Sequence, residues 1–199
     1  MKKITIALIM VISLIAPIQT MAESVTQTGT IIEPLEQNIE QIIDEITSEP
    51  RPINSDAIQN VKEYISEYFG NLGYDNIEYQ KFEYNDENNE NAIRHSSQAD
   101  VFLASTAENA IVDGIGENII VTKNSSIDTT KNLIISAHYD SAEDSVGAND
   151  NGSGVAAVLE LARILKDTEI PYNIKFILFS GEEKYMLGSR WYVGKLTED

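Results

Sequence analysis

The sequence predicts an α/β fold with a mostly parallel central sheet flanked by helices. Two apolar runs, 132–137 and 174–180, have the character of strands that are buried on both faces of a sheet. Between them, apolar residues recur at helical spacing over 154–167. A strand, a helix and a strand in succession predict a right-handed crossover between parallel strands. The 199 residues are enough for one ordinary domain.

The first 22 residues are typical of a secretory signal peptide. Two lysines precede a short apolar run, and small residues follow it, which predicts cleavage after Ala22. The alternative is an uncleaved membrane anchor, but the apolar run is shorter than the roughly 20 residues that a spanning helix needs. We therefore expect a secreted, extracellular protein without stable membrane association after cleavage.

Residues 23–53 are expected to precede the main domain, which we place at 54–199. Five apolar residues lie on one face of a predicted helix near 35–46, and Pro50 and Pro52 end it. This pattern fits a pro-segment or linker, and it equally fits an N-terminal helix that packs on the domain. The sequence leaves both alternatives open.

The next elements follow from caps and periodicity. Ser55 is the expected N-cap of a helix that ends near Gly70 or Gly73. Residues 76–84 alternate like a half-buried strand, but the apolar phase slips between Tyr79 and Phe82, which predicts a bulge. Residues 117–122 form a further strand. Residues 85–100 are an exposed loop, in which one of the two histidines of the chain, His95, is predicted to be a surface residue rather than a ligand.

Composition excludes several classes of partner. The formal net charge is −18, so we expect no nucleic acid partner, and an anionic membrane surface is also excluded. The chain has no cysteine and therefore no disulfide bond.

Polar residues follow both central strands where each strand ends. His138 and Asp140 follow the first, and Glu182 and Glu183 follow the second. Ligands of open α/β sheets bind beyond the carboxyl ends of the strands, so these side chains are expected at one edge. Asp150 lies in a glycine-rich turn that enters the helix between the two strands. One imidazole and several carboxylates favour a divalent metal, with Zn²⁺ the natural choice for nitrogen and oxygen ligands.

The individual residues suggest separate tasks. Asp140 could accept a hydrogen bond from the second ring nitrogen of His138 and so orient the ring. The turn around Asp150 lacks the lysine of a phosphate-binding loop and the spacing of a dinucleotide fingerprint, so a phosphate site is rejected. Glu182 and Glu183 point apart on an extended chain, so one could bind metal while the other acts as a base.

Three blocks of sequence together resemble a known family. These blocks are "SAHYDS", "GANDNGSGVAAVLELARIL" and "IKFILFSGEEKYMLGSRWYV". They resemble the co-catalytic zinc exopeptidases related to the bacterial secreted leucyl aminopeptidases, over about residues 54 to 199. The resemblance implies that His138 binds one zinc ion, Asp150 bridges two, and Glu183 binds the second. It also implies that Glu182 is the general base and that Asp140 supports His138.

The resemblance implies two zinc ions per complete site, peptide substrates and hydrolysis at the amino terminus. We expect a monomer. The family has a further aspartate and a further histidine ligand downstream of the glutamate pair, and no histidine follows His138 here. We therefore expect an incomplete fold, the amino-terminal part of a metallopeptidase, which could be inactive as this chain. Two alternatives stay open: a glutaminyl-cyclase-like acyltransferase with a single zinc ion, and a non-catalytic binding domain on the same scaffold.

Overall fold

The computed structural model describes residues 33–85 and 113–196. The predicted signal peptide and His95 lie outside these residues. Within them no helix is both long and apolar enough to cross a membrane. The elements follow in this order: α1 (Glu36–Ile46), α2 (Asp56–Asn71), β1 (Ile77–Tyr84), β2 (Gly114–Lys123), β3 (Asn132–His138), η1 (Ala148–Gly152), α5 (Ser153–Leu165), β4 (Asn173–Phe179) and α6 (Leu187–Leu196).

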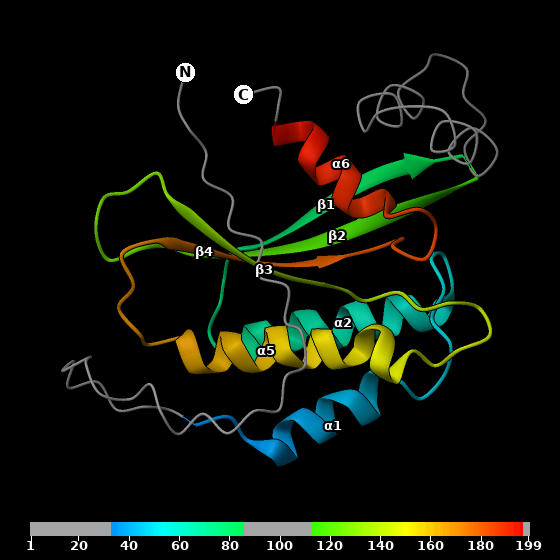
Figure 1. Cartoon of the computed structure of the whole chain (residues 1–199), viewed down its shortest axis with the longest axis horizontal. Helices are drawn as coiled ribbons and strands as arrows, with labels where there is room; N and C mark the ends of the chain where they lie inside the picture. Colours follow the sequence, from blue (N-terminus) through cyan, green and yellow to red (C-terminus); the bar gives the residue numbers. More distant parts are fainter. Residues whose placement is uncertain (1–32, 86–112, 197–199) are drawn as a thin grey trace, which may run out of the picture.

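The four strands form one sheet in the order β1-β2-β4-β3. Helices α1, α2 and α5 lie on one face of this sheet, and α6 lies on the other (Figure 1). Strands β3 and β4 are parallel, as the intervening α5 predicted, but the β1–β2 and β2–β4 pairings are antiparallel. The prediction of a mostly parallel sheet is therefore wrong for the described residues. A crossover between parallel strands needs a dozen or more residues. The connection 124–131 from β2 to β3 is shorter, so β2 runs antiparallel to β3. Because β4 is parallel to β3, β2 is also antiparallel to β4.

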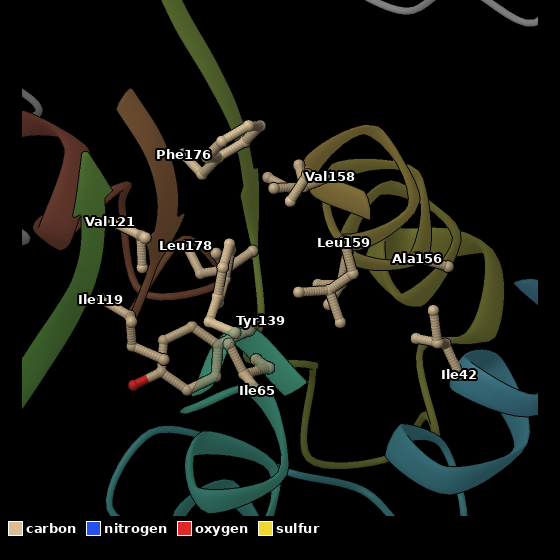
Figure 2. Packing of buried hydrophobic residues seen from close by; sticks show 14 of the residues in the cluster. Ile42, Ile65, Ile119, Val121, Tyr139, Ala156, Val158, Leu159, Phe176 and Leu178 are labelled. Carbon is tan, nitrogen blue, oxygen red and sulfur yellow. The ribbon is translucent and has the colours of Figure 1, made fainter. Parts of the chain in front are cut away.

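The main hydrophobic core lies between the sheet and helices α2 and α5. Alternate residues of β4, such as Phe176 and Leu178, point into it and are fully buried. Figure 2 shows these side chains facing Val158 and Leu159 of α5. Burying apolar side chains of this size stabilises the fold by about 1.5–3 kcal/mol each before the entropy cost of ordering them. This packing fixes the carboxyl ends of β3 and β4 relative to α5.

Strand β1 contains no bulge, so that prediction is wrong. Its pairing with β2 is continuous from Ile77 opposite Val121 to Tyr84 opposite Gly114. The apolar phase changes because the strand contributes to two different cores. Ile77 packs against the main core on the α2 side, whereas Phe82 is buried on the other face, beside Trp191 of α6.

Helix α1 packs directly on the domain. Ile42 and Ile46 are each 1% exposed and belong to the main core, and Figure 2 shows Ile42 facing Ala156 of α5. The Asn38 amide also donates to Glu160 of α5 at 2.6 Å. This packing does not separate a pro-segment from an N-terminal helix of the domain, because a pro-segment can pack in the same way. Whether residues 23–53 are removed during maturation stays a prediction.

The predicted ends of α2 are confirmed. The Ser55 hydroxyl accepts the backbone N–H of Ile58 at 3.1 Å, as an N-cap does. After the helix, Gly73 has a φ of 79°, and the N–H of Tyr74 returns to the carbonyl of Phe69 at 3.0 Å. This left-handed residue is the usual position of a helix-ending glycine.

A candidate metal centre between two loops

Two loops carry the candidate site. The β3 loop comprises residues 139–152 and leads from β3 into α5, and the β4 loop comprises residues 180–186 and leads from β4 into α6. His138 is the last residue of β3 and lies opposite Phe179 at the end of β4. Because these strands are parallel neighbours, the two loops begin side by side, as the sequence predicted.

The structure brings the predicted residues together. One ligand atom from each of His138, Glu182 and Glu183 lies within 4.8 Å of the other two. The Nε2 atom of His138 lies 3.0 Å from Oδ1 of Asp150 and 3.9 Å from Oε2 of Glu182. The His138 side chain is 9% exposed, whereas those of Asp150 and Glu182 are 75% and 40% exposed. A buried imidazole thus faces three more accessible carboxylates.

Asp140 has a different set of contacts from the one expected. The Nδ1 atom of His138 lies 3.2 Å from the main-chain oxygen of Asp140, while the nearer carboxylate oxygen is 3.6 Å away. The two carboxylate oxygens instead accept the backbone N–H groups of Glu182 and Glu183, each at 3.1 Å. Asp140 is fully buried. It therefore orients the histidine through its main chain and fixes the β4 loop through its side chain.

Arg51 braces the β3 loop from outside the predicted site. It is fully buried, and its guanidinium donates to main-chain oxygens of Tyr139, Val146 and Gly147. The sequence analysis assigned no role to this residue. The available signal was a single arginine between two prolines, which says nothing about partners roughly 90 residues away along the chain.

Asn118 braces the β4 loop. Its side-chain oxygen accepts the N–H of Ser180 at 3.1 Å, and its amide donates to the carbonyl of Gly188 at 2.9 Å and to Gln80 at 3.0 Å. It lies on β2 and is fully buried. The sequence analysis also missed this residue. A polar side chain at the start of a predicted apolar strand was the only signal available.

The turn η1, which contains Asp150, is not a regular helix. Gly147 begins the turn with a φ of 58°, and Asp150 itself is extended, at φ −118° and ψ 94°. Asn151 then caps the start of α5, because its side-chain oxygen accepts the N–H of Gly154 at 3.1 Å. The peptide bond between Asp150 and Asn151 is cis. The extended backbone at Asp150 places its carboxylate beside His138.

Carboxylate groups are concentrated around the imidazole of His138. Burial by itself lowers the pKa of His138, but contacts with Asp140, Glu182 and Asp150 outweigh burial and raise it to about 9. Burial, followed by the charge of Asp150, raises the pKa of Glu183, and His138 only partly offsets this. Several carboxylates around one imidazole repel one another unless a cation lies between them. The site therefore favours a positive charge.

The donor set fits a zinc ion. One imidazole nitrogen and carboxylate oxygens are common zinc ligands, and atoms that bind one ion at about 2.0–2.2 Å lie at most about 4.4 Å apart. The spread of up to 4.8 Å among the ligand atoms of His138, Glu182 and Glu183 is close to this limit. Glu182 and Asp150 are exposed enough to rotate, so small movements of their side chains are sufficient to close the site.

Comparison with known proteins finds similarity to peptidases, both in a family model and in a curated relative. Residues 118–198 match the model of Peptidase family M28. Over 90 residues, the chain is 43% identical to aminopeptidase YwaD of Bacillus subtilis, a match that covers 45% of this chain and 20% of YwaD. The chain thus spans about a fifth of the length of this curated relative.

Solved structures with the same fold include two kinds of enzyme. The zinc aminopeptidase BSAP of Bacillus subtilis superimposes with a TM-score of 0.62 at 19% identity, over 79% of this chain and 64% of BSAP. A glutaminyl cyclase of Porphyromonas gingivalis superimposes with a TM-score of 0.60 at 18% identity, over 80% of this chain and 52% of the cyclase. At these identities the likeness establishes the fold, which is that of the zinc aminopeptidases.

Proposed function

Because the chain belongs to peptidase family M28 and is related to the bacterial zinc aminopeptidases, we propose that it contributes to a secreted zinc aminopeptidase that removes amino-terminal residues from peptides. The single observation that carries this proposal is the convergence of His138, Glu182 and Glu183 at the carboxyl ends of two parallel strands. Asp150 completes the set through its contact with His138.

The proposed roles follow from accessibility and contacts. His138, Asp150 and Glu183 would hold zinc, which when bound supplies Lewis-acid polarisation of the scissile carbonyl. The side chain of Glu182 is 40% exposed. Its carboxylate would accept a proton from the attacking water and pass that proton to the leaving amine. Asp140 would keep both glutamates in place, because its carboxylate accepts both of their N–H groups.

Two other functions share this scaffold. A glutaminyl-cyclase-like acyltransferase would use a single zinc ion and would close amino-terminal glutamine into a ring, rather than release amino acids. A non-catalytic binding domain would need no metal for its stability. Fold similarity does not separate the first from a peptidase, because both kinds of enzyme superimpose on this chain.

The test is the zinc content of the purified full chain after dialysis, measured by elemental analysis. We expect near-stoichiometric zinc, which His138→Ala removes. His95→Ala is the matched control, because it removes the other histidine of the chain, and it should keep the metal. The chain should also be assayed for release of amino acids from peptide amides and for cyclisation of amino-terminal glutamine.

Equal zinc contents in His138→Ala and the parent would contradict the proposed site. Cyclisation without amino acid release would replace the peptidase with the acyltransferase. A chain whose thermal stability does not respond to zinc would favour the binding domain.

A further inference from the structure

The side-chain hydrogen bonds of Arg51 go to one loop of the site. Its Nε donates to the carbonyl of Tyr139 at 2.7 Å, Nη1 donates to Val146, and Nη2 donates to Gly147 at 3.2 Å. Its backbone N–H also donates to the Ser141 hydroxyl at 2.9 Å, and its carbonyl accepts the N–H of Ser141 at 3.3 Å. One residue therefore binds the β3 loop at five points.

These five points lie on both branches of the loop. Tyr139 directly follows His138, whereas Gly147 directly precedes the turn that carries Asp150. A planar guanidinium presents several donors in a fixed arrangement. By holding both branches at once, Arg51 sets the separation between the start of the loop and the Asp150 turn.

Close packing transmits this constraint to Asp150. A Cβ atom on Gly147 would lie 2.4 Å from the carbonyl oxygen of Asp150 and 3.3 Å from Nη2 of Arg51. A Cβ atom on Gly152 would lie 2.8 Å from Cγ2 of Thr47, just after α1. The N–H of Gly152 also donates to the carbonyl of Gly147 at 2.9 Å. The turn has no spare room between Arg51 and Asp150.

We propose that Arg51 is a positioning residue of the metal centre, which holds Asp150 within contact of His138. The segment that precedes the predicted domain is then part of the site's support. Any maturation cut that preserves the site lies before Arg51. The effect on metal binding rests on the proposed function, whereas the effect on the contact between His138 and Asp150 does not.

The first test measures that contact in the full, metal-free chain. In a His95→Ala background His138 is the only histidine, so its ring ¹H–¹⁵N signals are identified directly. Asp150→Asn provides the reference for a weakened contact. We expect Arg51→Met to move the His138 signals toward those of Asp150→Asn, and Arg51→Lys to move them part of the way, because one ammonium cannot bind both branches together.

Arg163→Met is the matched control. Arg163 is also held in the structure, but it pairs with Glu160 at 2.7 Å and donates to the Glu33 carbonyl, far from the β3 loop. We expect it to leave the His138 signals unchanged. Unmoved signals in the Arg51 variants would overturn the proposal. If Arg51→Met does not fold, Arg51→Lys decides in the same way.

The second test is a zinc titration of the same variants. Loss of a residue that orients a ligand typically reduces metal affinity about 10- to 100-fold, which we expect for Arg51→Met and not for Arg163→Met. Equal affinities in the two variants would overturn the proposal. If the parent binds no zinc, the proposed function fails, and the His138 signals alone decide whether Arg51 positions Asp150.

Discussion

The β3 loop and the β4 loop carry one site but are held in different ways. The β3 loop is bound through its main chain by Arg51, a residue 88 positions before Tyr139. The β4 loop is bound by two side chains, Asn118 of β2 and Asp140 of the β3 loop. Both loops are bound at main-chain groups. The β3 loop depends on one arginine from a distant part of the sequence, whereas the β4 loop depends on two polar side chains, one of which belongs to the β3 loop.

Asp140 links the two arrangements. Its main-chain oxygen contacts His138, and its carboxylate binds the N–H groups of Glu182 and Glu183. The proposed metal ligands therefore depend on a series of contacts that runs from Arg51 through the β3 loop to the β4 loop. Changes at different points of this series should have separable effects.

The largest effect is expected from removing the N-terminal brace. A chain that begins at Asn54 lacks Arg51 and the buried Ile42 and Ile46. Losing a buried isoleucine side chain costs about 2–5 kcal/mol, against a total stability of about 5–15 kcal/mol. We expect this chain not to fold, whereas a chain that begins at Glu33 melts like the full chain in circular dichroism. Equal melting temperatures would show that residues 33–53 are a dispensable linker.

Asp140→Ala should have the next largest effect. It leaves the N–H groups of Glu182 and Glu183 without their acceptor. Such a loss costs about 1–3 kcal/mol where the group is buried. We expect urea denaturation to show a loss of about 3 kcal/mol or more, together with loss of zinc. The control is Asp144→Ala, at an exposed position of the β3 loop. A loss no larger than that of the control would remove Asp140 from its role as the link.

Asn118→Ala should affect the β4 loop alone. It removes the side-chain acceptor of the Ser180 N–H and one donor to the Gly188 carbonyl, for an expected loss of about 2 kcal/mol. Hydrogen exchange should accelerate at residues 180–188 and stay unchanged at 139–147. Gln80→Ala, which removes only one partner of Asn118, should do much less. Acceleration in both loops would mean that they are not braced separately.

Gly147→Ala should destabilise the chain through the β3 loop. A φ of 58° costs an alanine about 1–2 kcal/mol, and the added Cβ meets the Asp150 carbonyl. Gly70→Ala is the matched control, because nothing lies within 4 Å of its added Cβ. We expect thermal melting to separate the two variants clearly. A Gly147→Ala chain as stable as the control would mean that the turn is looser than its contacts indicate.

The sequence predicted the elements of the domain well, because local signals specify them. The apolar run 174–180 is β4, and the cap of α2 is Ser55. Strand direction was predicted less well, since periodicity does not encode it, and the antiparallel β1–β2–β4 part of the sheet was missed. Helix α6 was not predicted either. Its burial against Phe82 and Phe179 depends on tertiary contacts.

The candidate site shows the same division. His138 and the glutamate pair could be named because polar side chains at strand ends are a local pattern, and Asp150 because it lies in a glycine-rich turn that enters a helix. Arg51 and Asn118 could not, because each acts on main-chain groups that lie far away in sequence. The hydrogen bond expected from His138 to the Asp140 carboxylate also differs, since that carboxylate is engaged by the β4 loop.

The central claim is that residues of both loops bind the same zinc ion. X-ray absorption at the zinc edge of the loaded full chain tests it most directly. We predict one imidazole nitrogen with oxygen ligands at about 2.0–2.2 Å. Any zinc that His138→Ala still binds when zinc is in excess should lack the imidazole signal, and the oxygen shell should change in Glu183→Gln. An imidazole signal that persists in His138→Ala, or a spectrum unchanged in Glu183→Gln, would contradict the account.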